Sequence, residues 1–152
     1  MTIAPIVQTV HTKAAPDRAF ALFTGRMGDW WPKGKTIGAN PHVAIVIEPH
    51  IDGRWYETDA NGQEANWGKV LAWDPPLGCL LAWQLNSQWQ YDPDCTTEVE
   101  LTFAPAADGG TDVTLTHRNL ERFGADADKQ VASLSGGWPS LVAGFAQFAD
   151  QA

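Results

Sequence analysis

Residues 97–118, with the sequence TEVELTFAPAADGGTDVTLTHR, contain two runs in which apolar and polar residues alternate. An apolar side chain at every second position is typical of a β-strand with one buried face. Asp108-Gly109-Gly110 separates the two runs and indicates a hairpin turn. Because so short a connection can join only antiparallel neighbours, this segment predicts an antiparallel hairpin.

Five more strands are predicted in the residues before this hairpin. Each is a short run rich in β-branched or aromatic residues, bounded by turn signals such as Asn61-Gly62. The predicted strands are residues 6–12, 43–48, 54–58, 66–73 and 79–85. The connections between the last four are again short, so we expect one antiparallel sheet.

Two segments have a helical period instead. Ala15-Pro16-Asp17 favours a helix start, and Gly25 and Gly28 predict that this first helix is short. Near the C-terminus, apolar residues fall on one helical stripe: Trp138, Leu141, Val142, Phe145, and Phe148 or Ala149. The glycines and proline at 136–139 indicate a kink or a new helix start, after a less regular helical turn or two in residues 126–135. The expected fold is therefore α+β, with a curved antiparallel sheet of six to seven strands around a long C-terminal helix.

Several short motifs occur in the same order as in a known family. They are residues 20–23 and 30–32, 47–49 and 53–57, 67–70, 73–76, 97–99, 110–111, 115–117 and 137–138. In this order and spacing the chain resembles the START and birch-pollen-allergen (SRPBCC) superfamily, and more narrowly the family named for the C-terminal domain of the activator of the heat-shock-protein-90 ATPase. The resemblance implies a helix-grip fold with an apolar cavity between sheet and helix, and it implies no single activity.

Length and composition restrict the possible partners. The 152 residues fit one domain, which we place at residues 1–152. The formal net charge of −8 opposes binding to nucleic acid, and no apolar run is long enough for membrane insertion. The N-terminus has no signal-peptide pattern, and Cys79 and Cys95 are expected to be free thiols, so we expect a cytoplasmic protein. The histidine spacing predicts no metal site, and we expect no cofactor.

Eight tryptophans suggest that the cavity has aromatic walls and holds a small, largely apolar or aromatic molecule. The alternative is that these side chains simply fill the core. Trp83 and Trp138 are the tryptophans that we most expect to point inward. The candidate ligand-binding residues are Trp30, Trp55, Trp67, Trp83, Phe103, His117, Trp138, Leu141 and Phe145.

His117 is the titratable residue with the most interesting position. It shares a strand face with Val113 and Leu115, so it should point inward, whereas the other three histidines are expected at the surface or in loops. It could act as a general base with Glu57 or Glu48, or it could be a hydrogen-bonded core histidine with no chemical role.

Three functions remain open on these grounds. The leading hypothesis is binding of an apolar small molecule. The second is an enzyme of the cyclase, dehydratase or hydrolase kind that uses His117 and a cavity glutamate. The third is a module that associates with a chaperone or forms a homodimer through exposed aromatic surface.

Overall fold

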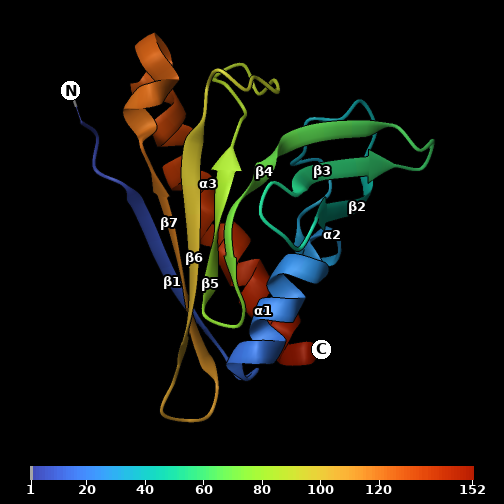
Figure 1. The fold of residues 1–152 in the computed structure, drawn as a ribbon, viewed down its shortest axis with the longest axis vertical. Helices are drawn as coiled ribbons and strands as arrows, with labels where there is room; N and C mark the ends of the chain where they lie inside the picture. The colour runs from blue at the N-terminus through green and yellow to red at the C-terminus, as the bar shows by residue number, and fades with distance from the viewer. Residues whose placement is uncertain (1) are drawn as a thin grey trace.

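The computed structural model describes residues 2–152 and shows a curved, fully antiparallel sheet with a long helix packed along it (Figure 1). The strands are β1 (Ile6–Thr12), β2 (His42–Ile47), β3 (Arg54–Asp59), β4 (Glu64–Asp74), β5 (Gly78–Trp83), β6 (Thr97–Pro105) and β7 (Thr111–Arg118). Their order across the sheet is β1-β7-β6-β5-β4-β3-β2. The predicted α+β class, strand number and antiparallel pairing are confirmed.

The β6–β7 hairpin lies as the alternating sequence predicts. Val99 pairs with His117, Leu101 with Leu115, and these side chains are all buried on the inner face. β1 pairs with the outer edge of β7, so the first strand of the chain completes this side of the sheet. The chain passes from β1 to β2, at the opposite edge of the sheet, through the two helices α1 (Pro16–Gly25) and α2 (Met27–Trp30).

The sheet bends at β4, where Figure 1 shows the strand turning from the β5 side toward β3 and β2. Two irregularities in pairing lie here: Trp67 has no partner between the Trp55–Gly68 and Tyr56–Asn66 pairs, and Leu71 has none on the β5 side. Such bulges bend a strand and redirect its side chains. Gly68 permits the tight contact with β5, because a Cβ there would lie 1.7 Å from the Ala82 carbonyl oxygen. Trp67 and Gly68 are consequently both buried.

The helices are α1 (Pro16–Gly25), α2 (Met27–Trp30), the 3-10 helix η1 (Leu120–Asp126) and α3 (Ala127–Gln151). α1 is short, as predicted. The new helix start expected at residues 136–139 is not found, because α3 runs without interruption through Pro139. The proline removes the hydrogen bond to the Ser135 carbonyl, but Ser135 is exposed, so water can replace that bond. None of the described helices is long and apolar enough to cross a membrane.

The interior between the sheet and the C-terminal half of α3 is filled by large side chains. Phe23 packs against Trp30, Phe103 and Phe145 with ring centroids 4.9–5.9 Å apart. The void left beneath this layer is about 10 Å³, too small for an organic ligand. Any binding space must therefore lie elsewhere along the helix.

Candidate functional site

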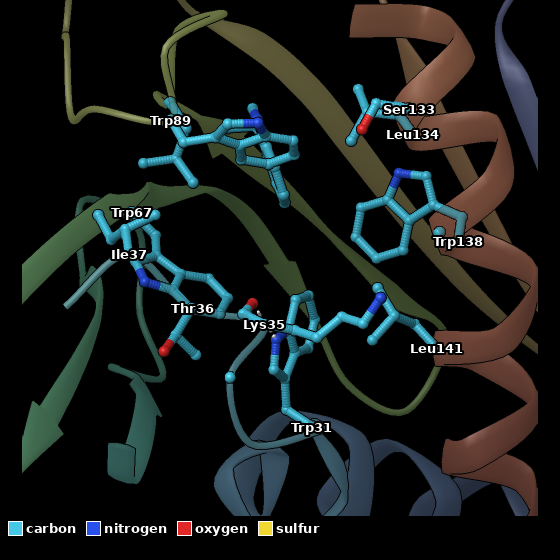
Figure 2. Close-up of a pocket in the computed structure, with 14 residues that line it drawn as sticks. Trp31, Lys35, Thr36, Ile37, Trp67, Trp89, Ser133, Leu134, Trp138 and Leu141 are labelled. Atoms are coloured by element: carbon cyan, nitrogen blue, oxygen red, sulfur yellow. Dashed lines mark hydrogen bonds between the residues drawn. The ribbon is translucent and has the colours of Figure 1, made fainter. Parts of the chain in front are cut away.

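A larger cavity of about 280 Å³ opens toward the N-terminal half of α3 (Figure 2). Its walls come from the loop after α2, from β4 and β5, from the segment after β5, and from α3. The lining residues are Trp31, Gly34, Lys35, Thr36, Ile37, Trp67, Trp83, Leu85, Trp89, Ser133, Leu134, Gly137, Trp138 and Leu141. Segments far apart in the sequence thus meet around one mostly apolar space.

Four indoles that line this cavity pack against one another in a closed ring, which we call the tryptophan ring: Trp31, Trp67, Trp83 and Trp138. Neighbouring ring centroids lie 4.9 Å apart for Trp31–Trp67 and 6.5 Å for Trp67–Trp83. The ring closes through Trp83–Trp138 at 5.5 Å and Trp138–Trp31 at 6.0 Å, both edge to face. Edge-to-face and tilted packing favours aromatic pairs, and each of the four side chains remains only 1–5% exposed.

The loop between α2 and β2 is held in place by a buried carboxylate. Glu57 on β3 is 2% exposed, and its Oε1 accepts hydrogen bonds from the backbone N–H groups of Ile37 at 2.9 Å and Gly38 at 3.2 Å. The same oxygen accepts a hydrogen bond from Trp67 Nε1 at 2.9 Å. One carboxylate oxygen therefore joins the loop wall of the cavity to the tryptophan ring.

His117 lies behind the tryptophan ring and is fully buried. Trp138 Nε1 donates to His117 Nδ1 at 3.1 Å, and because an indole can only donate, the proton of the neutral imidazole is on Nε2. That Nε2 lies 2.7 Å from Thr97 Oγ1 and donates to it. Burial lowers the pKa of His117 to about 3, so the ring is neutral at physiological pH. With both nitrogens bonded away from the cavity, His117 orients Trp138.

The polar groups of the cavity are few. Lys35 is its only charged lining residue among residues 2–152, and Thr36 and Ser133 are the lining residues with a hydroxyl group. In Figure 2 the Lys35 side chain extends from the loop across the cavity toward Leu141 on α3. Trp83 Nε1 is buried and has no acceptor within the described chain. The cavity thus combines aromatic walls with a small number of hydrogen-bonding groups, as ligand pockets do.

The predicted ligand-binding residues separate into two groups in the structure. Trp67, Trp83, Trp138 and Leu141 line the cavity. The others are packed behind its walls: Trp30, Trp55, Phe103, His117 and Phe145.

The glutamates proposed for chemistry lie apart from the cavity. Glu48 accepts a hydrogen bond from the Arg54 backbone N–H, and Glu57 holds the loop. Glu57 also borders a second, polar hollow of about 220 Å³ with Asp59 and Glu64. No three His, Cys, Asp or Glu side chains in residues 2–152 are grouped to hold a metal ion.

Other lining residues were not predicted from the sequence. Trp31 was present in the Trp30-Trp31-Pro32 motif, but no sequence signal shows which of the two adjacent indoles points to the cavity. Lys35 and Thr36 lie in a loop whose path is set by Glu57, twenty positions later. Trp89 follows β5 in a segment without regular periodicity.

His42 and the two cysteines are titratable residues that do not line the cavity. His42, expected at the surface, is 1% exposed, and its Nε2 lies 2.9 Å from the Gly28 carbonyl oxygen. That expectation was wrong because β2 packs its first residue against α2. Both cysteines are free, and burial raises the pKa of the Cys79 thiol to about 12, so this thiol is unreactive at neutral pH.

The curved sheet, the long C-terminal helix and the cavity beside that helix define a protein of the helix-grip class. Residues 13–150 match the family of activator of Hsp90 ATPase homolog 1-like proteins, and the chain belongs to that family. The resemblance found in the sequence motifs is thereby confirmed.

Solved structures show the same architecture. An anthrahydroquinone-γ-pyrone synthase, Txn09, solved in complex with SUM, is 34% identical, with a TM-score of 0.68 over 96% of this chain and 97% of the other. The self-sacrificing resistance protein CalC from Micromonospora echinospora is 28% identical, with a TM-score of 0.70 over 97% and 95%. The Aha1 dimer from Colwellia psychrerythraea, 16% identical with a TM-score of 0.63 over 97% of both chains, shares the fold. Comparison with curated proteins gave no match.

Proposed function

We propose that this protein binds a small, flat, largely aromatic molecule in the cavity that the tryptophan ring lines. The observation that carries the proposal is the cavity of about 280 Å³ whose walls include five tryptophans, four of them in a closed ring. Ligand pockets in proteins usually measure about 300–1,000 Å³, so this cavity suits a ligand at the small end of that range.

The packing of the walls also supports a preformed site. Trp138 is fixed by His117, Trp67 by Glu57, and Trp31 donates from Nε1 to the Lys35 carbonyl oxygen at 2.9 Å. Three of the four ring indoles are therefore oriented by hydrogen bonds before any ligand arrives. A binding surface that is already ordered loses less conformational entropy on binding. The 34% identical synthase, named for a fused aromatic product, supports an aromatic ligand.

The test is to fill the cavity without disturbing its walls. Gly137 lines the cavity, and a Cβ built there has nothing within 4 Å. A Cβ at Gly136 also has nothing within 4 Å, but Gly136 is exposed and lies outside the cavity. Gly137→Leu should abolish binding of naphthalene-2-carboxamide and anthraquinone-2-carboxamide, measured by calorimetry and tryptophan fluorescence. Gly136→Leu, the matched control, should bind as the unmodified protein does. Failure of the unmodified protein to bind either probe, or equal binding by both variants, would overturn the proposal.

A second candidate function is cyclisation of an aromatic precursor with loss of water, favoured by the similarity to the synthase Txn09. A suitable probe is 1-(2-hydroxyphenyl)-1,3-butanedione: its phenol oxygen attacks the distal carbonyl, a C–O bond forms, and water leaves to give 2-methylchromone. His117 would act here only by orienting Trp138, because both its nitrogens are already bonded. Product formation that is lost in Gly137→Leu and kept in Gly136→Leu would support this activity; equal rates in all samples and in buffer would exclude it for this probe.

Self-association remains a prediction from the sequence. Of the four large apolar side chains among residues 2–152 that are more than half exposed, Val7 at 51% and Val43 at 56% lie on β1 and β2, the opposite edges of the sheet. We propose analytical ultracentrifugation over a range of concentrations as its test. A mass that stays monomeric at high concentration would reject a homodimer.

A further inference from the structure

We propose that the ligand of the tryptophan ring carries a negative charge, as a carboxylate, phenolate or enolate, and that Lys35 pairs with it. This inference rests on the proposed binding function and names the class of ligand. It starts from the chemistry of the cavity wall, where one ammonium group faces an otherwise uncharged aromatic surface.

The backbone of Lys35 is fixed at the cavity. Its carbonyl oxygen accepts the hydrogen bond from Trp31 Nε1, and its N–H donates to the Pro32 carbonyl at 3.3 Å. Gly34, with a φ of +83°, allows the turn that precedes it. The side chain then extends over the cavity toward α3 (Figure 2). The position of this lysine is thus set by the same contact that orients one indole of the tryptophan ring.

The Lys35 ammonium has no protein partner in the part of the chain that the structure describes. It forms no salt bridge with any described carboxylate and lies over no described aromatic ring. The neighbouring Lys33, in contrast, donates to the His42 carbonyl oxygen. Glu57 on β3, which holds the loop of Lys35, is buried and accepts three hydrogen bonds from other groups. The cation is therefore free to pair with a charge on the ligand.

Selective binding of an anion by this protein requires a local positive charge such as the Lys35 ammonium. The formal net charge of −8 gives no general attraction for a negatively charged molecule, so selectivity for one must come from a local cation. An anionic oxygen beside the Lys35 ammonium would lie near Leu141 on α3, toward which this side chain extends (Figure 2). The aromatic part of the same molecule would then lie in the cavity, against the tryptophan ring.

The experiment compares two probes of nearly the same shape, naphthalene-2-carboxylate and naphthalene-2-carboxamide, by calorimetry at low and high salt. The variants are Lys35→Met, which keeps length and removes charge, and Lys35→Arg, which keeps charge. Lys69→Met is the control, because Lys69 is exposed on β4 and does not line the cavity. In the unmodified protein we expect the carboxylate to bind roughly 3- to 10-fold more tightly than the carboxamide, with this advantage reduced by salt.

The expected pattern is that Lys35→Met loses the preference for the carboxylate and its salt dependence, while Lys35→Arg and Lys69→Met keep both. Binding of the carboxamide should change little in Lys35→Met. Equal binding of the two probes by the unmodified protein, or a preference that survives in Lys35→Met, would overturn this inference and leave the proposed function standing. Absence of binding by both probes would overturn the proposed function as well.

Discussion

The indole of Trp138 and the imidazole of His117 form a hydrogen bond of 3.1 Å in which the tryptophan donates. The pair joins α3 to β7 across the interior, and only one of its members touches the cavity. His117, for which the sequence leaves a general base and a hydrogen-bonded core histidine open, thus lies one layer behind the cavity. His117 acts through Trp138 and through the shape of the tryptophan ring.

Replacing His117 should weaken both stability and binding. His117→Leu leaves the Trp138 N–H and the Thr97 hydroxyl without their partner, and a buried group that loses its partner costs about 1–3 kcal/mol in the free energy of unfolding. Urea denaturation measures this loss. In a Trp138→Phe background the same substitution should cost less, because one of the two orphaned groups is already absent. Equal losses in both backgrounds would mean that the bond between the two rings contributes nothing.

Stability should fall as the pH is lowered from 6.5 toward 3 because of His117. The unfolded chain takes up a proton on this histidine near pH 6.5, whereas the folded protein, with the pKa of His117 lowered to about 3, does not. The unfolded state therefore binds more protons in this window, and unfolding becomes easier by up to about 1.4 kcal/mol per pH unit. Comparing the unfolding free energies of the unmodified protein and His117→Gln from pH 7 to pH 4.5 checks this. The difference between the two should change with pH, and a constant difference would contradict the assignment.

The contribution of His11 to stability should change with pH in the opposite direction. Its hydrogen bonds to Asp112 and Asp108 raise the pKa of this exposed histidine above 6.5. Its contribution to stability is therefore complete at low pH and is lost as the pH rises through that raised value. Nuclear magnetic resonance titration should show a midpoint above 6.5 that falls in Asp112→Asn, the variant that removes the partner with the larger effect. A midpoint unchanged by this substitution would mean that the pair does not persist in solution.

Removing the carboxylate of Glu57 should loosen the cavity. Glu57→Ala leaves two backbone N–H groups and the Trp67 indole N–H without an acceptor, so we expect a loss of about 3 kcal/mol or more and weaker probe binding. Glu57→Gln keeps an acceptor oxygen and should lose less. Glu64→Ala is the control, because Glu64 pairs with Arg54 at the exposed surface, where such a pair is worth about 1 kcal/mol or less. Similar losses for Glu57→Ala and Glu64→Ala would contradict the role given to Glu57.

Gly68 should not tolerate a side chain. Gly68→Ala would place a Cβ 1.7 Å from the Ala82 carbonyl oxygen, so β4 and β5 would have to separate at the bend. We expect a destabilisation of about 3 kcal/mol or more, measured by thermal and urea unfolding. Gly136→Ala, where nothing lies within 4 Å, should instead stabilise α3 by about 1 kcal/mol. Two variants of equal stability would show that the bend is not as tight as described.

Local patterns predicted the fold because most of its strands are regular. The alternation from Thr97 to Phe103 placed the inner face of β6 correctly, since nothing interrupts the pairing of that strand. β4 does not follow this rule: the bulge at Trp67 places that indole and Gly68 on the inside together, which a period of two cannot predict. Pro139 left a kink or a new helix start open, and α3 continues through it without a new start, since water can satisfy the exposed Ser135 carbonyl.

The candidate site could be predicted only in part, for a different reason. Trp83 and Trp138 belong to regular elements, so their inward direction follows from strand and helix periods. Lys35 belongs to a loop, and the hydrogen bonds that place this loop come from Glu57 on a later strand. Whether Trp30 or Trp31 faces the cavity depends on how α2 meets the core, which is a property of packing.

The four indoles of the tryptophan ring come from positions as far apart as residues 31 and 138, and the long C-terminal helix supplies one of them. The cavity therefore exists only when both ends of the chain are in place, and the release of α3 would destroy it. A molecule bound there would contact both the loop after α2 and α3, and so would hold these two parts of the chain together. At a hundredfold excess over its dissociation constant it would add about 2.7 kcal/mol to the stability of the whole fold. Resistance of the protein to proteolysis would then increase with ligand concentration.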